Sequence, residues 1–140
     1  MERFEQIIET YYKANDGKKF RTEDECIFWE TMKEKYLNDA RHRVVENADG
    51  VKIHFFYINN PTEAHEVRRL CHTYLHRGLG IPNGFPEQPG WVCCGDDWYD
   101  YDDVPVMMSI DDYINNLMET IVNYKTELND VKAIKDEVTE

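Results

Sequence analysis

Hydrophobic side chains in the last third of the chain recur at alternating steps of four and three residues. This spacing is typical of helices that pack on another helix through a narrow seam. Ser109 stands before the pattern as a helix cap, and Asp111 and Asp112 follow in the first turn, where the helix dipole favours acids. We therefore predict a helix over residues 109–136, whose seam either forms a homodimer or packs its first half on a sheet. The seam residues are Ile110, Ile114, Leu117, Ile121, Tyr124, Leu128 and Val131.

Two shorter segments also have helical spacing. Thr22 and Glu25 form a capping-box pattern before a helix predicted over residues 23–41. A second helix is predicted to begin near Pro61 and to end at Arg77, where Gly78 provides a stop. The apolar face of the first helix consists of Cys26, Trp29, Met32, Tyr36, Leu37 and Ala40.

Strand signals occur in two places. Val51, Ile53, Phe55 and Tyr57 occupy every second position over 51–58, which predicts a strand. Residues 4–13 form a second predicted strand, and the turn signal Asn15-Asp16-Gly17 returns the chain through Lys18 to Phe20. The predicted fold is therefore a single α+β domain over 1–140: a small antiparallel sheet of about three strands, two amphipathic helices, a long acidic loop and a long C-terminal helix.

Residues 78–108 are rich in glycine and proline, so we predict a long irregular loop. It contains a run of five carboxylates interleaved with three large rings. Trp and Tyr dominate binding hot spots, and carboxylates match Arg and Lys clusters, so the run is a candidate partner-binding surface. The alternatives are a solvated loop whose rings enter the core, and a calcium loop, although the calcium spacing is absent. The candidate binding residues are Asp96, Asp97, Trp98, Tyr99, Asp100, Tyr101, Asp102 and Asp103, with Asp111 and Asp112 beside them.

The net charge of −12 is concentrated in the second half of the chain. Residues 91–140 contain 13 acids and 3 bases, and no Lys or Arg lies between Arg77 and Lys125. Such a field repels nucleic acid and attracts basic surfaces. We therefore expect no direct nucleic-acid binding and a host protein with a basic surface as the partner.

Histidines form a stripe on the second predicted helix, with His65, His72 and His76 opposite its apolar face. Two imidazoles four residues apart can hold Zn²⁺, so one hypothesis is a zinc site in which His72 and His76 are joined by Cys93 or Cys94. The alternatives are a basic stripe that pairs with the acidic loop or with a partner, and ordinary surface histidines. Apart from this possible zinc, no cofactor is expected.

Signals for catalysis, membranes and export are weak. The sequence has no nucleophile elbow, no phosphate-binding glycine loop and no dinucleotide fingerprint, so we expect a protein that is not an enzyme. It contains no run of 18 apolar residues and no basic start followed by an apolar stretch. The four cysteines lack the spacing of a disulfide framework, so we expect them to be reduced thiols in a protein of the cytoplasm.

One segment carries a resemblance to known proteins. The run Tyr12-x-x-x-Asp16-Gly17-Lys18-x-Phe20-x-Thr22-Glu23-x-Glu25-Cys26 resembles the opening of small phage and prophage accessory proteins. The resemblance covers about residues 8–30 and implies a class that includes anti-CRISPR and other anti-defence inhibitors, acting in the host bacterial cytoplasm.

The expected function is therefore binding and inhibition of a host protein by imitation of nucleic acid, with a nucleic-acid-binding defence protein as the expected target. The alternatives are a zinc-stabilised structural or regulatory module and a self-assembling phage component.

Overall fold

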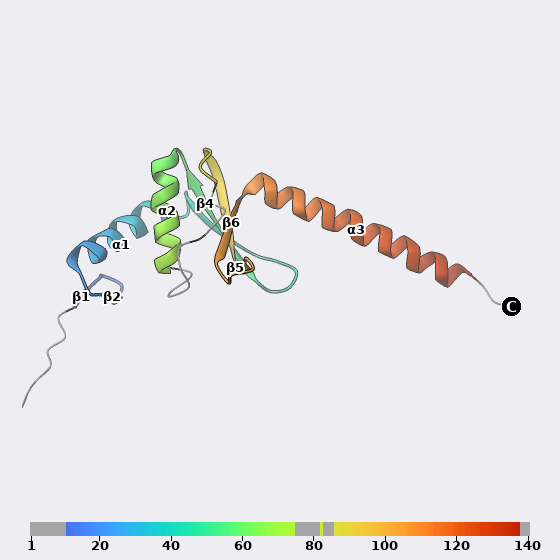
Figure 1. The fold of residues 1–140 in the computed structure, drawn as a ribbon, viewed down its shortest axis with the longest axis horizontal. Coiled ribbons are helices and arrows are strands. Elements are labelled where there is room, and N and C mark those ends of the chain that lie inside the picture. The colour runs from blue at the N-terminus through green and yellow to red at the C-terminus, as the bar shows by residue number, and fades with distance from the viewer. Residues whose placement is uncertain (1–10, 75–81, 83–85, 138–140) are drawn as a thin grey trace, which may run out of the picture.

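The computed structural model describes residues 11–74, 82 and 86–137. It is an α+β fold with a long C-terminal helix, as predicted (Figure 1). A hairpin of β1 (Tyr12–Lys13) and β2 (Lys19–Phe20) is followed by α1 (Glu23–Tyr36), β3 (His42–Glu46), β4 (Lys52–Ile58) and α2 (Pro61–Tyr74). The chain then forms β5 (Gly90–Tyr99), β6 (Pro105–Ser109) and α3 (Ile110–Asp136). Within the described residues, no helix is long and apolar enough to cross a bilayer.

The main sheet is antiparallel, with strand order β3-β4-β5-β6. One face of this sheet is covered by α1 and α2, and α3 leaves from the other side (Figure 1). The covered face forms the larger core, where Phe56, Val92 and Met107 of the sheet meet Trp29 of α1 and Leu70 of α2. The opposite face forms a smaller cluster around Ile53, Phe55 and Cys93, which the first turn of α3 partly covers.

The N-terminal turn forms as predicted. Gly17 has φ of +90°, a backbone angle that glycine adopts without strain. The Thr22 hydroxyl accepts a hydrogen bond from the backbone N–H of Glu25 at 3.2 Å, so one half of the predicted capping box is present. The predicted strand over 4–13 lies mostly outside the described residues, and only its end, β1, is seen.

The predicted end of the first helix at residue 41 is wrong, because α1 ends at Tyr36. The amide of Asn38 donates to the carbonyls of Glu34 and Lys35, which caps the helix. Its side-chain oxygen accepts from the N–H groups of Ala40 and Arg41, and this turns the chain into β3. A turn over residues 37–41 therefore replaces the last predicted turn of the helix and leads into the edge strand β3.

The predicted loop over 78–108 is also wrong for its second half. Residues 90–99 and 105–109 are strands, so the sheet has four strands rather than about three. Both neighbours of β5 are present, and its central residues are buried on both faces, so the strand shows no polar alternation. Pro105 stands at the first position of β6, where a missing N–H is tolerated.

Candidate interaction surface

The acidic-aromatic segment lies at the end of the β5–β6 hairpin rather than in an irregular loop. Cys94 pairs with Met107 and Tyr99 pairs with Pro105, so four residues of β5 face one residue of β6. This bulge folds the Trp98 indole back over Gly95, and a Cβ at position 95 would lie 2.5 Å from the ring. Trp98 therefore packs inward, as one of the sequence alternatives expected for the rings.

Contacts of Trp98 join the hairpin to the base of α3. The Trp98 ring lies 5.1 Å from the ring of Tyr113, and Tyr113 lies 6.0 Å from the ring of Phe55 on β4. These tilted aromatic pairs hold the hairpin and the first turn of α3 on the same side of the sheet. The carboxylates of Asp97, Asp111 and Asp112 are exposed around this aromatic contact.

A tight turn presents the remaining acids and one ring. Asp100 Oδ1 accepts hydrogen bonds from the N–H groups of Asp102 and Val104, and Asp103 adopts φ of +59°, which Asp tolerates better than most residues. Asp102 and Asp103 are exposed. Tyr101 is 107% exposed, so its whole side chain stands in solvent. The turn therefore presents an aromatic ring beside two carboxylates.

Two of the predicted binding acids make internal contacts. Asp100 closes the turn, as described above, and Asp96 Oδ1 lies 3.2 Å from Nε2 of the buried His54. Among the described residues, no Lys or Arg forms an ion pair with Asp97, Asp102, Asp103, Asp111 or Asp112. The acidic surface is therefore not neutralised by cationic side chains of the described parts of the chain.

Sequence reasoning missed a histidine pair beside this surface. Nε2 of His42 lies 3.2 Å from Nδ1 of His54, and the two rings stack at 5.5 Å. Burial lowers the pKa of both rings, to about 4 for His42, so both are neutral at pH 7. With both imidazoles neutral, His42 Nε2–H donates to His54 Nδ1, and His54 Nε2–H donates to Asp96 Oδ1. The network anchors the start of the hairpin to β4 and to the edge strand β3.

The predicted zinc site does not form from its four residues. Cys93 and Cys94 are neighbours on β5, so their side chains lie on opposite faces of the sheet, in different cores. Burial raises the pKa of both thiols to about 12, which disfavours the thiolate that zinc needs. His76 lies outside the described residues, and no group of three potential metal ligands occurs among the residues that are described.

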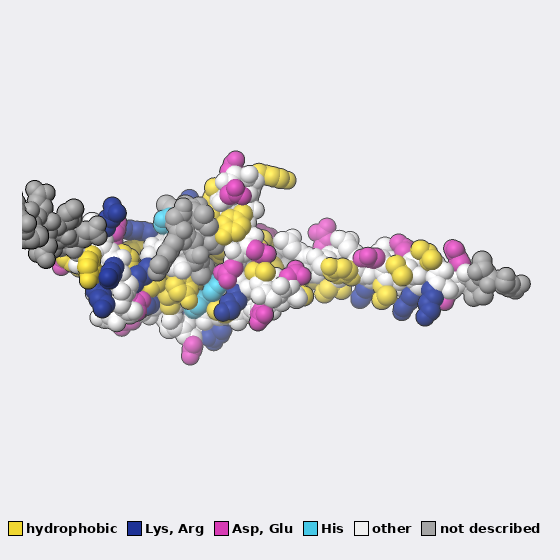
Figure 2. Space-filling model, turned by 90° about the horizontal axis from the view of Figure 1, so that it is seen from below, with side chains coloured by type: hydrophobic (Ala, Val, Ile, Leu, Met, Phe, Trp, Pro, Cys, Tyr) yellow, Lys and Arg dark blue, Asp and Glu magenta, His cyan; other side chains and the backbone are white. Residues whose placement is uncertain are grey.

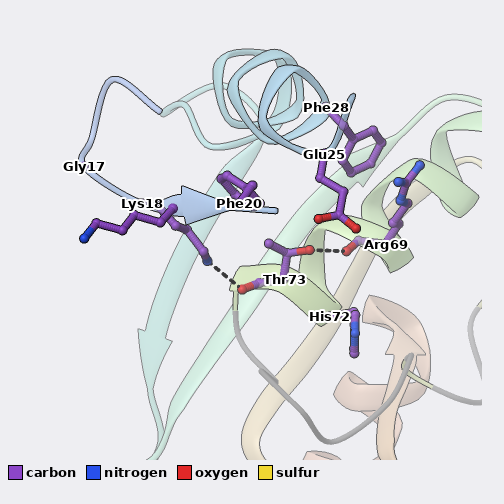
Figure 3. A pocket seen from close by; sticks show the side chains of 9 residues that line it. Gly17, Lys18, Phe20, Glu25, Phe28, Arg69, His72 and Thr73 are labelled. Carbon is purple, nitrogen blue, oxygen red and sulfur yellow. Dashed lines mark hydrogen bonds between the residues drawn. The ribbon is translucent and has the colours of Figure 1, made fainter. Parts of the chain in front are cut away.

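The two histidines of the predicted stripe that the structure describes, His65 and His72, have different surroundings. His65 lies 3.6 Å from Glu87, and both side chains are mostly exposed. His72 lines a hollow of about 690 Å³ between the β1–β2 hairpin, α1 and α2 (Figure 3). In this hollow Lys18 donates to the Thr73 carbonyl at 2.8 Å, and the Arg69 guanidinium stacks 4.0 Å above Phe28. Because these cations are engaged in contacts within the protein, we assign no ligand to the hollow.

The predicted seam of α3 is exposed along almost its whole length. No residue of α3 is buried, and only its beginning, around Ile110 and Tyr113, packs on the body of the protein. The alternative in which the first half of the seam packs on the sheet is therefore wrong beyond Tyr113. The six seam residues from Ile114 to Val131 are between 44% and 66% exposed. Figure 2 shows hydrophobic side chains along this helix, with Lys side chains on one edge of its distal half and acids on the other.

A groove of about 580 Å³ separates the near part of α3 from the sheet. Trp98, Tyr113, Leu117 and Tyr124 line this groove, together with the acids Asp49 and Asp97. The groove therefore connects the acidic surface of the hairpin with the exposed seam of α3.

Comparison with known proteins gives no match among family models, curated proteins or solved structures, so it adds no support to the resemblance of residues 8–30 to phage proteins.

Proposed function

We propose that this protein acts by docking on a cationic surface of another protein. The docking surface consists of the hairpin end and the start of α3, with Asp97, Tyr101, Asp102, Asp103, Asp111 and Asp112. The observation that carries the proposal is the exposure of these carboxylates, without a Lys or Arg partner among the described residues, together with the fully exposed Tyr101 on the turn that carries Asp102 and Asp103. Rings supply contact area, and the acids supply attraction to Arg and Lys.

The physical advantage of this surface is that contacts within the fold already hold its acidic residues in position before a partner binds. The turn is fixed by Asp100, and the hairpin is fixed by Trp98 and by the contact of Asp96 with His54. Binding therefore orders few additional side chains, and this lowers the entropy cost of association.

A row of exposed carboxylates on a rigid turn resembles a phosphate backbone in its charge. The cationic surface would then be one that normally holds nucleic acid, and docking would inhibit its protein by competition. That the inhibited protein belongs to a host defence system is a narrower proposal, which rests on the resemblance of residues 8–30 alone.

The first experiment measures binding of a fluorescent arginine-rich peptide by anisotropy. We expect Asp97→Asn, Asp102→Asn and Asp103→Asn together to weaken binding at least tenfold, because three unit charges are lost from the surface. Asn also tolerates the positive φ at position 103, so the turn is retained. The matched control is Glu34→Gln, Asp39→Asn and Asp130→Asn, which removes the same charge from exposed positions away from the hairpin.

The second experiment tests competition with nucleic acid. Purified bacterial defence nucleases cleave DNA in the presence of the wild-type protein, the triple hairpin variant or the control variant. The proposal expects inhibition by the wild type and the control and loss of inhibition by the hairpin variant. Equal inhibition by all three proteins would exclude the hairpin as the docking surface, and equal peptide affinity would exclude the proposal as a whole.

A further inference from the structure

We propose that α3 pairs with α3 of a second copy of the chain as an antiparallel two-stranded coiled coil, centred between Val122 and Asn123. This inference goes beyond the docking function and does not depend on it, because the seam residues and the hairpin acids Asp97, Asp102 and Asp103 are different side chains. Asp111, at the base of α3, takes part in both contacts. It rests on three observations: the exposure of the seam, its heptad register and the distribution of charge along the helix.

The register of the seam is self-complementary when the helix is reversed. Counting in heptads places Ile114, Ile121 and Leu128 at a positions and Leu117, Tyr124 and Val131 at d positions. About the proposed centre, every a residue meets a d residue of the second copy. The three distinct pairs are Ile114 with Val131, Leu117 with Leu128, and Ile121 with Tyr124, and two-fold symmetry makes each of them twice.

The two halves of α3 differ in charge. Residues 110–122 contain Asp111, Asp112 and Glu119 and no base, whereas all three lysines of the helix lie in residues 123–136. Lys125 and Lys132 occupy e positions, on the flank of the seam where Asp111 also lies. Reversing one helix places Lys132 of each copy beside Asp111 of the other. Lys135 falls opposite Ile110, next to the carboxylates at the base of the helix.

The parallel arrangement is disfavoured by the same charges. A parallel coiled coil gains an ion pair between Glu127 of one helix and Lys132 of the other. However, it places the two Lys135 side chains against each other in the seam and sets the two acidic first halves side by side. It also brings together the two bodies, each of which carries the acidic hairpin. In the antiparallel arrangement the helix separates these bodies by roughly 40 Å at 1.5 Å per residue. That distance exceeds the screening length of about 8 Å at physiological salt, so the bodies scarcely repel.

The shape of the protein leaves room for a second helix beside the distal half of α3, and beside its near half a second helix would enter the groove lined by Leu117 and Tyr124. α3 projects away from the body of the protein, and its distal half contacts none of the other helices or strands in Figure 1. Its Lys side chains line one edge of that half (Figure 2), as an e-flank contact requires.

Variants with one added cysteine on α3 distinguish the two orientations. Leu117→Cys and Leu128→Cys are prepared separately, and each protein is oxidised alone and after co-expression of the two with different affinity tags. The four native cysteines are buried, so the introduced thiol is the accessible one on α3. We expect a disulfide between Cys at 117 and Cys at 128 in the co-expressed sample only. In the antiparallel pair, position 117 of one copy lies about 16 Å along the axis from position 117 of the other, and the same holds for position 128. A disulfide cannot span this distance. Crosslinking of either variant with itself, or of none, would overturn the proposal.

A matched pair of lysine variants tests the seam without oxidation. Ile121 and Val122 are adjacent and similarly exposed, at 52% and 60%, but only Ile121 lies in the seam. We expect light scattering to give about twice 16.7 kDa for the wild type and for Val122→Lys, and 16.7 kDa for Ile121→Lys. A wild-type monomer at micromolar concentration, or a dimer that survives Ile121→Lys, would contradict the proposal.

Discussion

Glu63 is a buried carboxylate that joins α2, β4 and the chain leaving α1. Its two oxygens accept from the Arg41 guanidinium at 2.6 and 3.2 Å, and Oε1 also accepts from the N–H and side-chain amide of Asn59 at 2.9 Å. The Arg41 guanidinium is the main cause that lowers the pKa of Glu63 to about 2. Arg41 in turn donates to the Tyr57 carbonyl, so every part of this cluster is satisfied.

Replacing Glu63 by Gln should lower the free energy of unfolding by about 2 kcal/mol, because it leaves the Arg41 charge partly unpaired in a buried site. The control Glu66→Gln removes only the contact with Lys35 at 3.4 Å, which is exposed and worth at most about 0.5 kcal/mol. Urea unfolding at pH 7 measures both. A loss for Glu63→Gln no larger than that of the control would contradict the structural role of this cluster.

The same carboxylate predicts a pH dependence. Its pKa is lower in the folded state than the usual 4.5, so its contribution to stability is complete above pH 4.5 and is lost as the pH falls toward about 2. The difference in unfolding free energy between wild type and Glu63→Gln should therefore shrink over this range. A difference that is constant from pH 6 to pH 3 would show that the ionised form is not what Arg41 stabilises.

At the scale of elements, sequence reasoning was accurate where the pattern is local. The seam of α3 repeats every heptad, the strand over 51–58 alternates, and Thr22 caps its helix, so each could be read from neighbouring residues. β3 was missed because it is a mostly exposed edge strand that follows a helical pattern without a break. β5 was missed because its central residues are buried on both faces, so polar and apolar residues do not alternate along it. Gly90 and Gly95 also made the segment resemble a loop in the sequence.

The candidate site was predictable only in part for the same reason. The acidic run is visible in the sequence, but the inward turn of Trp98 depends on a bulge in strand pairing. The contact between His42, His54 and Asp96 depends on the register of three strands, and no local spacing reports it. The zinc hypothesis grouped Cys93 and Cys94 because the alternation of β5, which places their side chains on opposite faces of the sheet, is not visible in the sequence.

The packing of Trp98 over Gly95 at the β5–β6 bulge can be tested by substitution. Gly95→Ala places a methyl group against the rigid Trp98 ring, at a Cβ distance of 2.5 Å, so the indole must leave Tyr113. We expect a loss of about 1–3 kcal/mol in stability and a red shift of tryptophan emission. In a Trp98→Ala background the same change should cost much less, because the clash is gone. Equal costs in both backgrounds would show that the ring does not occupy this position.

At the scale of the whole molecule, the two proposals place two acidic docking surfaces at opposite ends of one particle. Residues 91–140 then combine two kinds of contact: the hairpin acids face a cationic partner, and the seam of α3 faces a second copy. Asp111 takes part in both contacts, but the seam residues and the hairpin acids Asp97, Asp102 and Asp103 are separate side chains, so each contact can be removed alone. Ile121→Lys should abolish the dimer and keep the affinity of each copy for the arginine-rich peptide, whereas the triple hairpin variant should do the reverse.

Two docking surfaces on one particle predict avidity. On a sensor surface coated densely with the arginine-rich peptide, both ends of a dimer can bind, so the second contact becomes intramolecular. We expect wild type to dissociate at least tenfold more slowly than Ile121→Lys at high peptide density. At low density the spacing between peptides exceeds the span of the particle, and the two rates should converge. Val122→Lys should follow the wild type at both densities, since it carries the same added charge outside the seam. If Ile121→Lys and wild type dissociate alike on the dense surface while scattering still reports a wild-type dimer, the two acidic hairpins cannot reach one surface together, and the geometry proposed for the pair is incorrect.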